Sequence, residues 1–341
     1  MAKKVSSWGL LVVVTALVTI AGIVFVVRWQ YHEALKPVSH SQKLILVTVE
    51  SGASAEDIAK QLQDQGLIKK AWAFEWFVRN QGYLSELKAG TYAFTPNDGV
   101  EAIVKTITTG EVATDLVTVI PGNRIDQVEA GLINAGFSPQ SVIEALKSEQ
   151  YRGHPALVDL PTGVSLEGYL FPESFQKTAE TTAEEIIQKS LDEMASALSP
   201  RIRKGIANQG MNVHEGVTLA SIIEQEVTDP GDKRLVAGVF YNRLAKGINL
   251  ESDATAPYGA VLDGFEPSLI HDSAYNTYLN KGLPPGPISN VSLSSLEAVS
   301  NPASTDFLFF VSGDDGTTYF ATTIEQHERN IAEHCKKLCN N

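Results

Sequence analysis

Residues 213–247 read VHEGVTLASIIEQEVTDPGDKRLVAGVFYNRLAKG and predict two successive helices. The helices separate near Pro230, because proline ends one helix and is well placed in the first turn of the next. The second helix is followed by Gly247, and glycine commonly stands just after the last helical residue. Leu235, Val239 and Leu244 are apolar positions along it. Together with strands predicted nearer the C-terminus, this pair places the second half of the chain in the mixed α+β class.

The first of these helices places carboxylates in apolar surroundings, in the segment ASIIEQE of residues 220–226. Glycosidic cleavage needs a general acid, and an apolar site raises the pKa of a Glu so that it holds a proton near neutral pH. Glu224 has small neighbours one turn before it, Ala220 and Ser221, which leave room for a sugar. Glu226 has two isoleucines there. Periodicity alone does not separate the two, and a solvated or salt-bridged Glu is the alternative for either.

Catalytic motifs of other kinds do not occur in the sequence. It has no G-x-S-x-G nucleophile elbow and no H-E-x-x-H zinc motif. It also lacks a Walker loop and a Gly-rich dinucleotide fingerprint, and its seven histidines are scattered. These observations disfavour Ser or Cys triads and metal-dependent hydrolysis, and they leave carboxylate catalysis as the simplest option.

The chain carries 40 acidic and 27 basic side chains, for a net charge of −13. Because an acidic surface repels phosphate backbones and no basic run occurs, nucleic acid is excluded as the main partner. The two cysteines, Cys335 and Cys339, lie near the C-terminus and predict either free thiols or a local disulfide. With His334 they supply too few ligands for a zinc site.

Residues 9–27 read GLLVVVTALVTIAGIVFVV and contain no charged residue. As a helix this run spans roughly 28 Å, close to the thickness of the hydrocarbon core of a bilayer. It is longer than the apolar core of a signal peptide, and no small-x-small cleavage site follows, which favours an uncleaved anchor. Lys3 and Lys4 precede the run, so the positive-inside rule places the N-terminus inside and the remaining chain outside.

An internal repeat relates residues 47–66 (VTVESGASAEDIAKQLQDQG) to residues 117–136 (VTVIPGNRIDQVEAGLINAG), seventy positions on and without a gap. Each copy predicts a short strand, a turn at Gly52 or Gly122, a helix and a final glycine. Ser54 is suited to cap the first helix. Such small units resemble LysM-type wall-binding modules, and a repeated packing unit without a ligand is the alternative.

Further elements are predicted on both sides of the central helices. The segment SLEGYLFPESF, residues 165–175, is dense in aromatics and predicts either a core strand or turn, or one wall of a sugar cleft. Residues 248–290 are loop-rich and polar, and a loop of this length inside a compact domain is usually functional. The other predicted elements are a strand at 87–94, helices at 99–106, 181–210 and 294–301, strands at 307–311 and 318–322, and a last helix from Glu325.

Several segments resemble the YceG-like (MltG) endolytic murein transglycosylase family. They are LASIIEQE at 219–226, VAGVFYNRLAKGINLESDAT at 236–255, AYNTYLNKGLPPGPISN at 274–290 and NPASTDFLFFV at 301–311. The anchor, the LysM-like region and LEGYLFPESF fit the same family. The resemblance therefore covers nearly the whole chain, and its 274–290 segment is long and specific.

The resemblance implies a bacterial inner-membrane protein whose catalytic domain faces the periplasm and the cell wall. In this family the first Glu of the ASI-[IV]-E-x-E stretch is catalytic, which corresponds to Glu224. This residue would protonate the oxygen between MurNAc and GlcNAc and then accept the proton of the MurNAc 6-hydroxyl, which closes on C1 as a 1,6-anhydro end. Such cleavage needs no second carboxylate, metal or cofactor. Peptidoglycan glycan strands are the implied substrate, and peptidoglycan synthases are implied partners.

The chain departs from the family pattern within the loop-rich region. Glu251 stands where the family usually has Gln, and Ala274 stands where it usually has Pro. An extra carboxylate at Glu251 is predicted near the cleft, where it would raise the pKa of Glu224 or change the preference for strands. The candidate substrate-binding residues are Glu226, Glu251, Ser252, Asp253, Tyr258, Tyr275, Asn276, Thr277 and Tyr278. Asn and Tyr in a Gly/Pro-rich loop are alternatively turn formers.

The sequence thus predicts an α+β protein with one N-terminal transmembrane helix, LysM-like α/β units and a mixed α+β catalytic domain. The expected divisions are a cytoplasmic tip and anchor at 1–30, a stalk at 31–43, a LysM-like module at 44–112, a second strand–helix unit with linker at 113–163, the transglycosylase domain at 164–334 and a tail at 335–341. Two alternatives stay open: a membrane-anchored peptidoglycan-binding scaffold without catalysis, and an ordinary hydrolytic muramidase.

Overall fold

The structure is a computed structural model, which describes residues 7–41, 43–110, 112, 116–178 and 180–340. Contacts between Cα atoms divide the chain into two compact units, Met1–Asp115 and Leu116–Asn341. Helices dominate both units, and within the described residues the strands form separate two-stranded antiparallel sheets. The predicted mixed α+β class is therefore confirmed.

The first unit packs short helices against one strand pair. Strands β1 (Ile45–Val49) and β2 (Gly90–Phe94) pair antiparallel, with Val47 opposite Tyr92. Both of these side chains are buried, as expected where alternate strand residues face one core. The helices are α2 (Ala55–Asp64), α3 (Ala71–Gln81) and α4 (Val100–Thr109), with a 3₁₀ turn at Tyr83–Ser85. Their buried faces add Ile58, Leu62, Phe74, Val78, Ile103 and Ile107 to the core.

Helix α1 (Ser7–Leu35) continues five residues into the segment that the sequence predicts to be a stalk. Its last turn packs on α3, where the ring centroids of Tyr31 and Trp76 lie 4.4 Å apart. Glu33 also accepts a hydrogen bond of 3.1 Å from the ammonium of Lys69. These contacts explain why the helix extends beyond the apolar run.

The predicted membrane-spanning run, residues 9–27, lies within α1, but most of its side chains are outside those that the structure describes. In the described part of the chain, no helix combines the length and the apolar character that crossing a membrane requires. The membrane anchor therefore stays a prediction of the sequence.

The second unit contains the two helices predicted at residues 213–247 and the elements around them. Its N-terminal elements are β3 (Leu116–Thr118), α5 (Ile125–Asn134), α6 (Pro139–Ala145) and β4 (Ser174–Gln176), with 3₁₀ turns at Ser148–Tyr151 and Pro155–Leu157. The central helices are α7 (Ala183–Ala197), α8 (Pro200–Asn208), α9 (Val213–Glu226), α10 (Pro230–Lys246), α11 (Thr255–Leu262) and α12 (Leu293–Ser300). The C-terminal elements are β5 (Phe309–Ser312), β6 (Thr318–Ala321), α13 (Ile324–His334) and a 3₁₀ turn at Leu338–Asn340.

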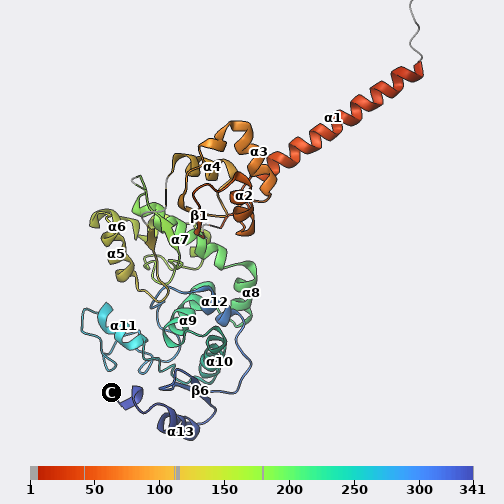
Figure 1. Ribbon diagram of the computed structural model, residues 1–341. Helices are drawn as coiled ribbons and strands as arrows, with labels where there is room; N and C mark the ends of the chain where they lie inside the picture. The colour runs from red at the N-terminus through yellow and green to blue at the C-terminus, as the bar shows by residue number, and fades with distance from the viewer. Residues whose placement is uncertain (1–6, 42, 111, 113–115, 179, 341) are drawn as a thin grey trace, which may run out of the picture. The chain divides into compact units, whose positions relative to one another are not determined.

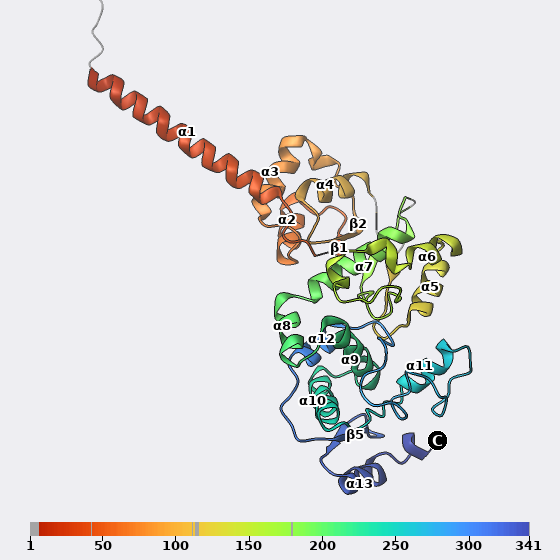
Figure 2. The ribbon, with the colours of Figure 1, turned by 180° about the vertical axis from the view of Figure 1, so that it is seen from behind.

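Helix α12 is the element against which the central helices pack. It contacts α8, α9 and α10, and the two opposite views show these helices side by side (Figures 1 and 2). Gly205 of α8 permits this approach, because a Cβ there would lie 2.4 Å from the carbonyl oxygen of Ser300. The helix predicted over 181–210 is instead two helices, since Pro200 begins α8 directly after the capping residue Ser199.

The internal repeat is reproduced in the local structure. The first copy folds as β1, a turn at Gly52 and α2, and the second folds as β3, a turn at Gly122 and α5. Both turn glycines have positive φ, 84° and 76°, a conformation that glycine adopts without strain. The strand partners differ, because β1 pairs with β2 whereas β3 pairs with β4. The second copy thus belongs to the same compact unit as α9 and α10.

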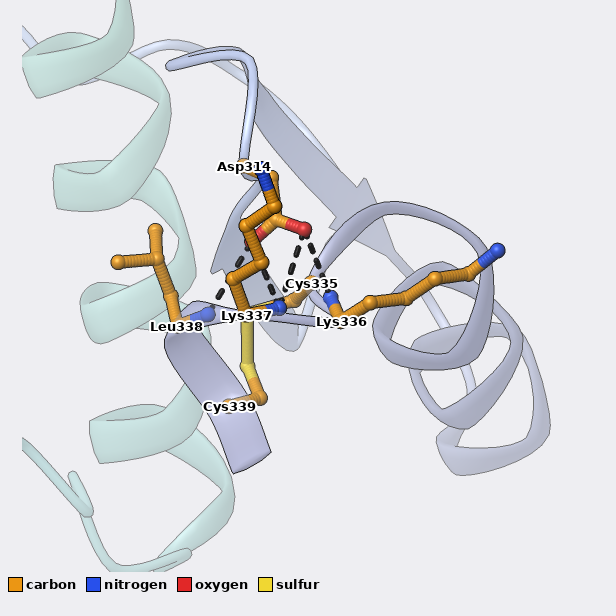
Figure 3. Close-up of a disulfide and its surroundings, with 6 residues drawn as sticks. All are labelled: Asp314, Cys335, Lys336, Lys337, Leu338 and Cys339. Atoms are coloured by element: carbon orange, nitrogen blue, oxygen red, sulfur yellow. Dashed lines mark hydrogen bonds between the residues drawn. A yellow bond between two sulfur atoms is a disulfide. The ribbon is translucent and has the colours of Figure 1, made fainter. Parts of the chain in front are cut away.

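The C-terminal turn is closed by a disulfide between Cys335 and Cys339, whose Cα atoms lie 5.4 Å apart. Of the two alternatives for these cysteines, the structure has the local disulfide. The carboxylate of Asp314 accepts hydrogen bonds from the backbone amides of residues 336–338, at 3.0 to 3.1 Å (Figure 3). This contact attaches the turn to the loop between β5 and β6.

The segment at residues 165–175 yields a stability prediction at Gly168. This residue has φ of 82°, and a Cβ there would lie 2.4 Å from Cβ of Pro287. Gly168→Ala should therefore add both backbone strain and a steric clash, and lower the free energy of unfolding by about 2–5 kcal/mol. Urea unfolding of the full chain, followed by circular dichroism, measures the change.

Gly163→Ala is the matched control for this prediction. Gly163 has φ of 80° but open space where its Cβ would lie. Only the backbone strain should remain, so we expect a loss of about 1–2 kcal/mol. Equal losses for the two variants would show that the close approach of Pro287 does not constrain the segment.

Candidate active site

Glu224 lies in the last turn of α9 and lines a cavity of 520 Å³ in the second unit. The facing walls come from the turn that opens α5, which contributes Arg124, and from α11, which contributes Tyr258. The turn is held beside α9, because the side-chain amide of Gln225 donates a hydrogen bond of 2.7 Å to the backbone carbonyl of Gly122. The second repeat copy therefore forms part of the candidate site.

One oxygen of the Glu224 carboxylate, Oε2, accepts all the hydrogen bonds that the described residues make to this side chain. The ammonium of Lys233 lies at 3.0 Å and the backbone amide of Ser292 also at 3.0 Å. The hydroxyls of Ser292 and Ser295 lie at 2.5 and 2.6 Å. Lys233 comes from the first turn of α10, and both serines come from the start of α12. The carboxylate therefore joins three helices.

These donors act on the protonation of Glu224. Burial is the largest single effect and raises its pKa, but the hydroxyls of Ser292 and Ser295 and the charge of Lys233 together hold the pKa below its usual range. The sequence predicts the opposite direction, because the apolar neighbours along α9 are visible in it and the donors from α10 and α12 are not. The surroundings of Glu224 thus favour its carboxylate form.

Glu226 lies on a different face of α9, because two residues along a helix correspond to a rotation of about 200°. It does not line the cavity, and its Oε1 accepts a hydrogen bond of 2.5 Å from the hydroxyl of Ser252. Burial and the nearby charge of Asp253 raise the pKa of Glu226 to about 7. The two carboxylates that periodicity left equivalent therefore have opposite pKa shifts.

A third carboxylate, Glu167, lies behind the wall that faces Glu224. Glu167 is 4% exposed and accepts hydrogen bonds from the backbone amide of Ile125, at 3.1 Å, and from the hydroxyl of Tyr258, at 3.2 Å. Burial raises its pKa to about 7. Glu167 therefore fixes the hydroxyl of Tyr258, whose ring also packs on Tyr275 with centroids 4.9 Å apart.

Arg124, Gln127 and Glu167 are residues of this region that the sequence reasoning missed. A signal for the first two was present, since the repeat copies differ in their turns: SGASAED in the first copy and PGNRIDQ in the second. The two copies share the strand–turn–helix pattern but differ in the polar residues of the turn, which indicates that the second turn has a separate role. Glu167 stands in the aromatic segment 165–175, for which the sequence predicts either a core strand or turn or one wall of a sugar cleft.

The predicted loop residues divide into cavity and scaffold positions. Tyr258 lines the cavity. Asn276 is fully buried, and its side-chain amide donates to the carbonyls of Leu269 and His271 at 3.1 and 2.8 Å. Thr277 is also buried, and its hydroxyl shares a hydrogen bond of 2.8 Å with that of Thr255. These contacts are those of the turn-forming alternative.

The remaining candidates form a cluster beside Glu226. Asp253 accepts a hydrogen bond from the hydroxyl of Tyr278, and Ser252 donates to Glu226. Glu251 forms an ion pair of 2.9 Å with Arg243. It has the only positive φ, 53°, among the described non-glycine residues. Glu251 thus pairs with Arg243. Glu251 is not among the main causes of the pKa shift of Glu224.

Comparison with known sequences identifies similar proteins over most of the chain. The profile of the YceG-like family matches residues 47–333. A protein of Bacillus subtilis strain 168 named endolytic murein transglycosylase is 31% identical, over 86% of this chain and 86% of its own length. A protein of the same name from Streptococcus pneumoniae serotype 2 is 31% identical over 90% of this chain, but this chain spans only 62% of its length.

A solved structure is similar as well. The crystal structure of a yceG-like protein from Listeria monocytogenes superposes with a TM-score of 0.56 at 32% sequence identity. The match covers 85% of this chain and 99% of the Listeria chain. The sequence and structure comparisons therefore agree on the same family across both compact units.

The raised pKa of Glu167 predicts a pH dependence of stability. A folded-state pKa of about 7 exceeds the unfolded value near 4.5, so the folded protein binds more protons and its stability falls as the pH rises between these values. Glu167→Gln cannot ionise and should reduce the slope of this fall by at most about 1.4 kcal/mol per pH unit, while the contribution of Glu226, whose pKa is also about 7, remains. Urea unfolding of both proteins at intervals between pH 4.5 and 7.5 measures it.

Glu144→Gln serves as the control, because Glu144 is exposed at the surface beside Lys147. This variant should keep the wild-type slope. A Glu167→Gln protein with the same slope as the wild type would mean that Glu167 is ionised throughout the range, contrary to the effect expected from its burial.

Proposed function

The chain belongs to the YceG-like family, and from this premise we propose that it is an endolytic lytic transglycosylase that cleaves peptidoglycan glycan strands. Glu224 is the proposed catalytic residue. One observation carries this assignment: Glu224, unlike Glu226, lines the 520 Å³ cavity. Tyr258 and Arg124 line the same cavity and are suited to contact a sugar by stacking and by hydrogen bonding.

The proposed reaction uses Glu224 twice. The protonated carboxyl gives its proton to the oxygen that bridges MurNAc C1 and GlcNAc C4, and the C1–O bond breaks with its electron pair on that oxygen. The MurNAc 6-hydroxyl then bonds to C1 and releases its proton to the Glu224 carboxylate. No water is consumed, and the proton of Glu224 is restored. Because the 6-hydroxyl is the nucleophile at C1, no carboxylate nucleophile is needed.

The acid half of this cycle requires Glu224 to gain a proton, although its hydrogen-bond donors favour the charged form. Burial already acts on this residue in the required direction, and a sugar that fills the cavity would remove further water from the carboxyl. Substrate binding is thus proposed to raise the pKa of Glu224. Since the protonated fraction of the free enzyme falls with rising pH, kcat/KM should fall as well.

Glu226 is the second candidate for the acid, because its pKa of about 7 would keep it half protonated at neutral pH. Its contact with Ser252 and its place outside the cavity disfavour it. A hydrolytic muramidase and a binding protein without catalysis are the alternatives at the level of function. They differ from the proposal in the products released.

Product analysis tests these alternatives together. Purified protein incubated with glycan strands should release 1,6-anhydro-MurNAc ends, detected by mass spectrometry. Glu224→Gln keeps the shape of the side chain but cannot donate a proton, so its rate should fall at least about 100-fold. Glu226→Gln is the matched variant on the same turn of α9 and should retain most of the activity.

Each contrary outcome selects one alternative. Reducing ends in place of anhydro ends would indicate hydrolysis, and strands that are bound but never cleaved would indicate a scaffold. Activity that survives in Glu224→Gln and is lost in Glu226→Gln would move the catalytic role to Glu226.

We further propose that residues 9–27 anchor the protein in the bacterial cytoplasmic membrane, with the second unit outside the cell. The uncharged 19-residue run supports an anchor, and the disulfide between Cys335 and Cys339 suits an oxidising compartment. The strand–turn–helix units are proposed as LysM-like glycan-binding elements. Association with peptidoglycan synthases stays a prediction of the family resemblance.

Charges placed in the middle of the run test the anchor. Leu17→Arg together with Val18→Arg should cost about 5–7 kcal/mol of insertion free energy and move the protein out of the carbonate-washed membrane fraction. Leu46→Arg, at an exposed position of β1, is the control and should leave the distribution unchanged. Retention of the double variant in the membrane fraction would contradict an anchor at 9–27.

A further inference from the structure

Lys233 is a buried cation beside the proposed catalytic residue. It is 2% exposed, and its ammonium uses three hydrogen bonds, to Glu224 at 3.0 Å and to the hydroxyls of Ser292 and Ser294 at 3.1 Å each. An ammonium has three N–H donors, so the group is fully satisfied where it lies. Its position is therefore fixed by α9 and α12 together.

Folding stability does not explain this placement. Lys233 stands in the first turn of α10, where the helix dipole disfavours a cation, and Glu224 stands in the last turn of α9, where it disfavours an anion. A buried ion pair also loses hydration that its attraction only partly restores. An apolar pair of similar size would be expected to stabilise the fold at least equally, which points to a role in the site.

The contacts distinguish the two oxygens of Glu224. Oε2 already accepts four donors, which exceeds the roughly two lone-pair positions of one carboxylate oxygen. Ser292, the N-cap residue of α12, gives its hydroxyl to this oxygen and makes no side-chain cap to its own helix. A proton arriving at Glu224 therefore has room only on Oε1.

We infer that Lys233 is a positioning residue for the proposed reaction, which holds Oε2 of Glu224 as the charge-bearing oxygen and leaves Oε1 as the oxygen that gives and takes the proton. This inference rests on the proposed function, since it assigns the two oxygens of the same acid. It places the bridging sugar oxygen and the 6-hydroxyl on the Oε1 side. Lys233 itself touches no substrate in this arrangement.

The arrangement also makes Lys233 the charged group that hydrogen-bonds to Glu224, whereas Arg124, which lines the same cavity, pairs with Asp126. From α10 the facing charge is Lys233, and α12 presents hydroxyls and a backbone amide. Glu297 of α12 instead pairs with Arg201 at the surface, and Glu226 lies on another face of α9. Loss of the cation should therefore favour the protonated form of Glu224. Burial raises the pKa of this carboxyl, and without the cation only the donors of Ser292 and Ser295 would lower it.

Charge-removing and charge-keeping variants test the inference in the full-length protein. Lys233→Met and Lys233→Gln remove the cation, and Lys233→Arg keeps it. The midpoint of the Glu224 carboxyl, followed by ¹³C NMR and assigned by comparison with Glu224→Gln, should rise by about 1 pH unit or more in the two neutral variants. It should stay near the wild-type value in Lys233→Arg.

The pH profile of kcat/KM provides the second measurement. The protonated form of Glu224 is the active one, so kcat/KM falls as the pH rises through the pKa of Glu224. A variant that raises this pKa should move the fall of kcat/KM to higher pH by as much as the midpoint rises. A merely structural residue would lower the rate without moving the fall. Arg201→Gln is the matched control, since it removes an exposed cation that reaches α12 from α8.

The possible outcomes separate this inference from the proposed function. A Glu224 midpoint that is unmoved in both neutral variants, or equally moved in Lys233→Arg, would overturn the role of Lys233. Two neutral variants are used because one of them can fail to fold, which thermal unfolding detects. If Glu224→Gln remains active, the proposed catalytic assignment fails, while the NMR titration still reports whether Lys233 controls the protonation of Glu224.

Discussion

The ion pair between Glu224 and Lys233 is the contact on which the geometry of the candidate site depends. It joins the end of α9 to the start of α10, and the serines at the start of α12 complete it. Because each partner opposes the dipole of its own helix, the pair is stable only while all three helices are in place. The position of the proposed acid therefore depends on the packing of α12 against α9 and α10.

The cavity beside this pair is assembled from parts that are distant in the sequence. The turn of the second repeat copy contributes Arg124, and α11 contributes Tyr258. Glu167 connects these two walls, since it accepts from the amide that follows Arg124 and from the Tyr258 hydroxyl. The strand–turn–helix unit whose first copy belongs to the first compact unit forms, in its second copy, one side of the candidate site.

Three carboxylates in one unit differ in pKa because burial and donors act on each to a different extent. Burial raises the pKa of Glu224, but a cation, two hydroxyls and an amide outweigh it and favour the charged form. Burial raises the pKa of Glu226, which accepts from one hydroxyl and lies near the charge of Asp253, and it raises the pKa of Glu167 as well, so both have pKa values of about 7. The proposed acid is thus the one that is ionised before substrate binds, and water exclusion by the sugar is the physical step that would change its state.

The sequence by itself determined the local elements: the two helices at 213–247, the strand–turn–helix repeat, and, by family resemblance, the choice of Glu224. These depend on propensities and on neighbours three or four positions away, which a sequence displays directly. Only the tertiary structure decided which carboxylate faces the cavity, that Asn276 and Thr277 hold the loop, and that Glu251 turns to Arg243. The physical reason is that these contacts join residues far apart in the sequence. The serine donors to Glu224, for example, stand 68 and 71 positions further along the chain.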